Sequence, residues 1–270
     1  MPGADAARAL PRWQDLTHPE AADLAGRDPV AVLPLAAIEQ HGPHLPLDTD
    51  LRIGEGLLQA AADRLPEDFP LLVLPPLTIL ASPEHARFAG TLSLTPETAL
   101  RVLMETGHAV AGAGVRRLVL HNSHGGNRAV ADTAALELRQ RHRMLVVRHH
   151  YFLQDPPAQA GIPAAEQRHG LHGGQIETAM MHHLAPQQVR DAEARHADSL
   201  GGELESTLEV LRPEGPAGFA WLAGDLNSAG STGDARAATA DQGRLLVEHY
   251  AAFLAATLRD ARAFPLDRLA

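Results

Sequence analysis

Five side chains that can bind a metal ion or carry a proton lie within one short stretch, IEQHGPHLPLDTD at 38–50: Glu39, His41, His44, Asp48 and Asp50. The stretch directly follows the apolar run VAVLPL (30–35), which predicts a buried strand. Glu39 and His41 are two positions apart, so an extended backbone points both side chains to the same side. Imidazole and carboxylate groups bind zinc, manganese and iron. The stretch therefore indicates a metal site at the end of a strand.

Two later segments carry the same residue types. His124 lies in HNSHGGN (121–127), and His172 and Glu177 lie in HGGQIET (172–178). Ligands bind outside the carboxyl ends of strands in an open parallel sheet, so we expect all three segments to meet at that edge. The glycines in HNSHGGN would also suit a nucleotide phosphate, but the chain lacks both G-x-G-x-x-G after a strand and G-x-x-x-x-G-K-[ST]. A metal cluster explains the histidines and carboxylates as well.

Apolar runs alternate with helix-period segments, which predicts one α/β domain over residues 1–270 with a mostly parallel sheet and helices on both faces. The expected strands are 30–35, 71–77, 116–122 and 144–152. The expected helices are 50–65, 95–114, 127–142, 174–184 and 235–261. Thr95 and Pro96 mark a helix start, and Asp48, Thr49 or Asp50 is expected to cap the helix 50–65. The stretches 156–167 and 212–225 predict irregular loops over the site.

Composition argues against several other classes of protein. A formal net charge of −10 does not suit a nucleic-acid binder or a protein drawn to an anionic membrane. The chain has no cysteine, so a metal must be held by imidazole, carboxylate or water. The opening MPGADAARALPRW lacks the apolar core of a signal peptide, and no apolar run is long enough to span a bilayer. We expect a cytoplasmic protein.

The motifs IEQHGPHLPLDTD, SPEHARFAGTLSL (82–94), HNSHGGN, HGGQIET and GSTGDARAAT (230–239) together resemble those of the creatininase (creatinine amidohydrolase) family. The resemblance spans about residues 30–245. It implies a three-layer α/β/α fold, two divalent metal ions per subunit, and hydrolysis of carbon–nitrogen bonds in amides. It also implies a homo-oligomer, often a hexamer. Zinc is the favoured metal, with manganese and iron as alternatives.

The resemblance also implies roles for single residues. Glu39 and His41 would bind different metal ions, and Asp50 would bridge the two. His124 would complete the shell of one ion, and Glu177 would serve both as the acid of the second metal site and as a catalytic group. The proton-transfer histidine of the family falls on His172.

Three departures from the family pattern bear on the substrate. Creatininases in the narrow sense have a carboxylate where this chain has Gly126, so we expect Glu177 to supply the missing ligand. Gln175 stands where many members have Glu, and the segment 150–180 has no tryptophan to stack on a flat ring. These departures argue against creatinine and favour an amidohydrolase acting on another small cyclic amide, a formamide or a peptide-like bond. The alternatives are a deformylase, a peptidase in cofactor maturation, or a catalytically retired member that binds metal or a metabolite.

Several nearby residues have simpler interpretations. Asp48 reads as a helix cap and His44 as a support of the site, whereas Glu84 and His85 either line the pocket or lie on a surface loop. Asn122 and Asn127 are expected to order the loop around His124. Phe219 and Trp221 form either a core corner or a substrate wall supplied by a neighbouring subunit. Asp234 holds a loop or contacts substrate. Packing or surface roles are expected for His149, His150, His182 and His183.

Overall fold

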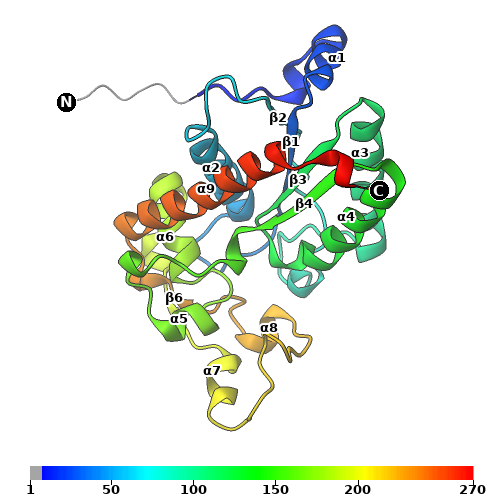
Figure 1. Ribbon diagram of the computed structural model, residues 1–270. Helices are drawn as coiled ribbons and strands as arrows, with labels where there is room; N and C mark the ends of the chain where they lie inside the picture. Colours follow the sequence, from blue (N-terminus) through cyan, green and yellow to red (C-terminus); the bar gives the residue numbers. More distant parts are fainter. Residues whose placement is uncertain (1–7, 270) are drawn as a thin grey trace, which may run out of the picture.

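The carboxyl ends of four parallel strands meet at one edge of the sheet in a computed structural model that describes residues 8–269 (Figure 1). The strands are β1 (Val30–Leu35), β2 (Leu71–Val73), β3 (Arg117–Asn122) and β4 (Leu145–His150), in the order β2-β1-β3-β4. All three pairings are parallel, as predicted. Leu35 lies opposite Asn122, and Asn122 opposite His150, so the residues that follow β1, β3 and β4 start level with one another.

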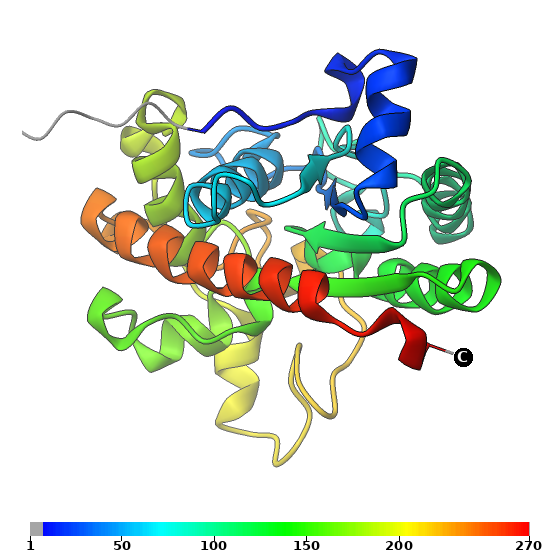
Figure 2. The same cartoon turned by 45° about the horizontal axis from the view of Figure 1, so that its top comes forward.

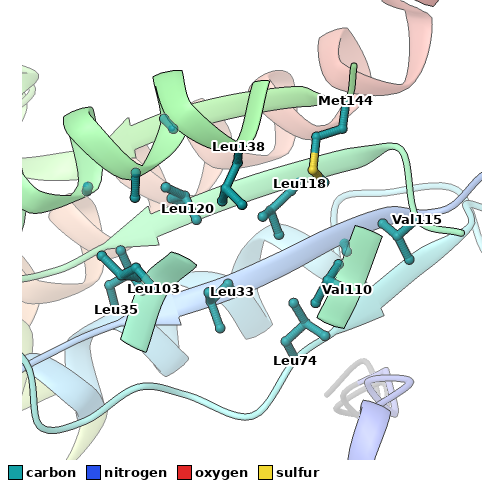
Figure 3. Packing of buried hydrophobic residues seen from close by; sticks show 14 of the residues in the cluster. Leu33, Leu35, Leu74, Leu103, Val110, Val115, Leu118, Leu120, Leu138 and Met144 are labelled. Atoms are coloured by element: carbon teal, nitrogen blue, oxygen red, sulfur yellow. The ribbon is translucent and has the colours of Figure 1, made fainter. Parts of the chain in front are cut away.

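Helices cover both faces of this sheet, which confirms the three-layer architecture. Successive residues of a strand point to opposite faces, and β1 is buried along its whole length. Leu33 and Leu35 pack with α3 (Pro96–Gly112) and α4 (Arg128–His142), together with Leu118 and Leu120 of β3 (Figure 3). This core explains why the strands read as unbroken apolar runs.

The opposite face carries the helices that bear part of the site. Val30 and Val32 pack against α2 (Thr49–Ala62) and the long α9 (Ala240–Ala263), which crosses the sheet in Figure 2. The helix α6 (Gln175–Leu184) packs against both α2 and α9. The first turns of α2 and α6 therefore lie near the carboxyl edge of the sheet.

The structure corrects several predicted boundaries. The strand expected at 71–77 ends at Val73, because Pro75 and Pro76 have no N–H for a ladder, and only the isolated bridge of Leu77 with Leu35 continues the pairing. The strand expected at 144–152 ends at His150 and continues as a 3-10 turn. The last helix begins at residue 240 instead of 235, where Thr239 accepts a hydrogen bond from the Gln242 N–H.

Short elements escaped prediction. They are α1 (His18–Gly26), α5 (Ala164–His169), α7 (Leu200–Glu205), α8 (Ala223–Leu226) and the antiparallel pair β5 (His196–Ala197) and β6 (Gly233–Asp234). Three-residue 3-10 turns also occur, at 13–15, 83–85, 125–127, 151–153, 158–160, 186–188, 191–193, 235–237 and 266–268. The stretches expected to be irregular thus contain part of α5 and most of α8. Apart from α1, these elements carry too few residues for a periodic pattern. The nine-residue α1 does have a start signal in the sequence, a capping box formed by Thr17 and Glu20.

No helix among residues 8–269 is both long and apolar enough to cross a membrane. Most of the opening stretch that was considered for a signal peptide, residues 1–7, lies outside the described residues.

The helices α9 and α6 approach each other tightly at Gly243, where an added Cβ would overlap the Ala179 carbonyl group and lie 2.6 Å from its carbon. We expect Gly243→Ala to lower the free energy of unfolding by about 1–3 kcal/mol or more, because backbone must move to admit the methyl group. Urea unfolding of the purified variant measures this change.

The matched control is Gly112→Ala, because a Cβ at this helical position meets no atom within 4 Å. Its free energy of unfolding should equal that of wild type or exceed it by up to about 1 kcal/mol, because alanine is favoured over glycine in a helix. Equal stability of the two variants would contradict the close packing of α6 on α9.

Candidate metal centre

Six predicted site residues come together at the carboxyl edge of the sheet. Glu39 and His41 follow β1, Asp50 lies in the first turn of α2, and His124 follows β3. A loop and the first turn of α6 contribute the remaining two, His172 and Glu177. All are buried except Glu177, which is half-buried. Their ligand atoms form two groups in which every atom lies within 4.8 Å of the others, namely Glu39 with Asp50 and His124, and His41 with His172 and Glu177.

Two carboxylate oxygens at the centre of this cluster lack a hydrogen-bond partner among the described residues. Glu39 Oε1 is 3.2 Å from His124 Nδ1, and Asp50 Oδ2 is 3.3 Å from the same nitrogen. Of the other two oxygens, Glu39 Oε2 accepts a hydrogen bond from Ser82 Oγ at 2.5 Å, and Asp50 Oδ1 lies 3.2 Å from His41 Nε2. Buried ionised oxygens are costly without a partner. A cation between these atoms would supply one, so the donor set fits a divalent metal.

Backbone carbonyls fix the orientation of three histidines in the cluster. A ring nitrogen that faces a carbonyl oxygen must donate, so the opposite nitrogen of a neutral ring carries the lone pair. The lone pairs are thereby directed into the cluster from Nε2 of His41, Nδ1 of His124 and Nδ1 of His172. His41 Nδ1 faces the Glu39 carbonyl oxygen at 3.1 Å. His124 Nε2 faces that of Ala81 at 3.0 Å, and His172 Nε2 faces that of Gln40 at 2.5 Å.

The carboxylates make the cluster strongly electronegative. Burial alone would lower the pKa of His41, but the charges of Asp50, Glu177 and Glu39 outweigh it and raise this pKa to about 10. The pKa of His124 is likewise raised against burial, by Glu39 and Asp50. Burial would raise the pKa of Asp50, yet the two imidazoles hold it well below its usual value. Such a field favours cations.

Two other histidines at the site show the opposite behaviour. Burial lowers the pKa of His172 to about 4, and burial together with the neighbouring imidazole of His172 holds the pKa of His85 far below its usual range. The ring centroids of these two residues are 4.1 Å apart. His85, which the sequence left open between pocket and surface loop, is 2% exposed and lines the cavity beside the cluster.

Glu84 explains why the chain has glycine at position 126. An added Cβ at Gly126 would overlap Glu84 Oε1 and lie 2.5 Å from His124 Nε2 and 2.7 Å from the Ala81 oxygen. The Glu84 carboxylate is 3.5 Å from His124 Nε2, on the side of the ring opposite Nδ1. The space that a side chain at 126 would need is thus filled by Glu84 and by the hydrogen bond that orients His124.

The supporting residues lie around the cluster, and Asp48 has the cap position expected for it without the capping hydrogen bond. His44 Nε2 bonds Thr178 Oγ1 at 2.9 Å. Asp48 occupies the cap position of α2 but makes no capping hydrogen bond, because its side chain accepts from Arg52 Nε at 2.8 Å. Asn122 and Asn127 do order the loop around His124, through hydrogen bonds to its backbone and to that of Ala36 and Ala81.

Glu166 is a supporting residue that the sequence did not mark. Its buried carboxylate accepts the N–H of Gln175 at 2.7 Å and the N–H of Asp234 at 2.9 Å. These two hydrogen bonds connect α5 with the start of α6 and with β6. The loop that bears His172 lies between α5 and α6 in the chain. Asp234 in turn holds the loop that follows it, by accepting from Arg236.

A cavity of about 920 Å³ opens from the cluster towards the surface. Its inner end includes the carboxylates of Glu39 and Asp50, and its outer walls include Phe152, Phe219 and Trp221. The last two come from the predicted loop 212–225 of the same chain. A cleft that combines apolar walls with a few convergent polar groups is the usual form of a substrate site.

A parallel α/β sheet with buried histidines and carboxylates at its carboxyl edge is a layout typical of metal-dependent enzymes. The family profile of creatininase, described as creatinine amidohydrolase, matches residues 14–258. A mycofactocin precursor peptide peptidase of Mycobacterium tuberculosis is 34% identical over 244 residues, which cover 88% of this chain and 87% of that protein. A creatinine amidohydrolase of Pseudomonas putida is 31% identical over 183 residues, which cover 62% of this chain and 69% of that protein.

Solved structures agree with this result. A structure titled "Creatininase Mn" matches with a TM-score of 0.75 and 26% identity, over 95% of this chain and all of that chain (100%). A "Zn-Zn type" mutant creatininase matches with a TM-score of 0.75 and 26% identity, over 96% of this chain and 100% of that chain. The chain belongs to the creatininase family and is an enzyme, a hydrolase of carbon–nitrogen bonds.

The crowding at Gly126 gives a direct test of the site geometry. We expect Gly126→Ala to reduce zinc uptake and to lower the free energy of unfolding by about 1–3 kcal/mol, because His124 and Glu84 must move. Elemental analysis after zinc loading and urea unfolding measure the two effects.

Gly125→Ala is the matched control, since a Cβ there meets no atom within 4 Å. This neighbouring variant should keep its zinc and stay within about 0.5 kcal/mol of wild type. Wild-type zinc uptake by Gly126→Ala would show that the packing of Glu84 on His124 does not support the site.

Proposed function

We propose that this protein is a two-metal amidohydrolase that cleaves a carbon–nitrogen bond in a peptide-like substrate. The observation that carries the proposal is the pair of unpartnered, buried carboxylate oxygens, Glu39 Oε1 and Asp50 Oδ2, among histidines that direct lone pairs at them. A structural ion pair would leave neither oxygen without a partner.

Five residues would hold the two ions. Glu39, Asp50 and His124 would bind one, and His41 with Glu177 the other, with Asp50 shared between the two sites. The ions, of zinc or alternatively manganese or iron, would activate water and polarise the amide carbonyl. Glu177 is suited to replace the carboxylate missing at position 126, because the Gly173 N–H, at 2.6 Å from Glu177 Oε2, orients it towards His41 and His172.

His172 is the proposed proton carrier. Its Nε2–H is committed to the Gln40 carbonyl, so only Nδ1, which lies 3.6 Å from Glu39 Oε1, can accept a proton from the attacking water. The same nitrogen can then protonate the departing nitrogen, which would otherwise leave as a poor amide anion. Glu177, within the same cluster, adds negative charge that stabilises the protonated ring.

The size of the cavity and the relatives favour a peptide-like substrate over a small ring. A volume of about 920 Å³ is large for a single five-membered ring. Phe219 and Trp221 on the outer walls could contact residues beyond the cleaved bond. The relatives from Mycobacterium tuberculosis are named as peptidases of the mycofactocin precursor peptide, which favours trimming of a peptide-derived cofactor precursor. Small cyclic amides and formamides are the second candidates, because of the likeness to the Pseudomonas putida enzyme.

Three further expectations stay predictions. They are the single-domain organisation, a homo-oligomer that the family resemblance implies to be a hexamer, and the cytoplasmic location.

The number of bound ions tests the metal assignment. Elemental analysis of the zinc-loaded wild type should find close to two ions per chain. Asp50→Asn should lose both ions, since it removes charge from the carboxylate shared between them. Asp48→Asn is the control, because the Asp48 carboxylate pairs with Arg52 outside the cluster and should not bind metal. A wild-type protein that takes up no divalent metal would refute the proposal.

Turnover tests the role of His172 and the substrate class. We expect metal-loaded wild type to cleave a short peptide or peptide-derived amide from a panel that also holds creatinine, lactams, cyclic ureides and formamides. His172→Gln should keep both ions and lower kcat at least about 100-fold, as loss of an acid–base group does. His183→Gln, at an exposed position, is the control. Full activity of the His172 variant would contradict the proton-carrier role.

A further inference from the structure

His85 lies at the cluster but has no role in the function proposed above. It ends the 3-10 turn Pro83–His85, is 2% exposed and lines the cavity. Its Nε2 is 3.6 Å from Glu39 Oε1. Distances alone would group it with Glu39 and His172 as metal ligands. The hydrogen bond on the other side of its ring excludes that interpretation.

The amide of Gln40 fixes this hydrogen bond. Gln40 Oε1 accepts the Gly42 N–H at 2.9 Å, and Gln40 Nε2 donates to the Gly230 carbonyl at 2.6 Å. Two independent backbone groups thus determine which end of the amide is oxygen and which is nitrogen. The nitrogen end is the one that faces His85 Nδ1, at 2.8 Å.

The tautomer of His85 follows from this contact. Because an amide nitrogen can only donate, Nδ1 of His85 must accept, and the neutral ring carries its proton on Nε2. This is the reverse of the neutral rings of His41, His124 and His172, in which the outer nitrogen donates to a carbonyl and the inner nitrogen carries the lone pair. His85 therefore turns an N–H, not a lone pair, towards the cluster and the cavity.

We propose that His85 is a fixed hydrogen-bond donor to the carbonyl oxygen of the scissile amide and is not a metal ligand. This assignment rests on the proposed amide hydrolysis. When water adds to the carbonyl carbon, a carbon–oxygen bond forms and the π electrons move onto the carbonyl oxygen. The Nε2–H stabilises that negative charge, and His85 keeps its proton throughout. Its packing against His172 and its bond to Gln40 hold the donor in place before substrate arrives, which is the condition under which such donors are most effective.

The test compares His85→Leu, which removes the donor at similar bulk, with His85→Gln, whose side-chain amide can place an N–H near the position of Nε2. We expect His85→Leu to lower kcat by about 100- to 1,000-fold with little change in KM, as loss of one oxyanion donor does. His85→Gln should recover a large part of kcat. Both variants should retain two zinc ions per chain.

Nitrogen-15 NMR of histidine-labelled, zinc-loaded wild type reads the tautomer without any substrate. For the His85 ring, assigned by its loss in His85→Leu, we expect a protonated Nε2 and an unprotonated Nδ1. Loss of a zinc ion in His85→Leu, an unchanged kcat in that variant, or a zinc-bound or unprotonated Nε2 would each overturn the assignment. Failure of the proposed function is a separate result, because it is read on wild type as absent metal or absent turnover, while the NMR measurement still decides the tautomer.

Discussion

The fold buries two carboxylates, Glu39 and Asp50, at the centre of the site, and the groups around them must compensate their negative charge. Both carboxylates are at most 2% exposed, and each has one oxygen without a hydrogen-bond partner among the described residues. Uncompensated buried charge costs several kcal/mol, so the fold must bring compensating groups to these oxygens. The raised pKa values of His41 and His124 have the same cause, the negative charge of these carboxylates. A divalent cation would neutralise more of that charge than a proton, so metal binding would also stabilise the folded site.

The sheet brings the compensating groups close to these buried carboxylates. The level carboxyl ends of β1 and β3 place Glu39, His41 and His124 side by side, and the first turns of α2 and α6 close the cluster with Asp50 and Glu177. Carbonyl groups of the surrounding loops then orient the rings. A histidine whose outer nitrogen donates to a carbonyl offers a lone pair, and one whose outer nitrogen accepts from an amide offers an N–H. The outer neighbour of each neutral ring thereby decides whether its inner nitrogen presents a lone pair or an N–H.

Long elements and the ligand segments were predictable from the sequence, whereas the contacts between them were not. Unbroken apolar runs are typical of strands covered on both faces, so β1 and β3 were found nearly to the residue. Short elements such as α8 were missed because they contain too few residues for a period. Glu84 filling the space beside Gly126, and Gln40 fixing the His85 tautomer, depend on contacts between distant segments, which residue types and spacing do not encode.

Anomalous X-ray diffraction from crystals grown with manganese or zinc would locate the bound ions. We expect two peaks per chain, one among Glu39, Asp50 and His124 and one among His41, Asp50 and Glu177, with no bond from either ion to His85. The absence of both peaks, or metal bound only outside this cluster, would show that the buried carboxylates do not form a two-metal site.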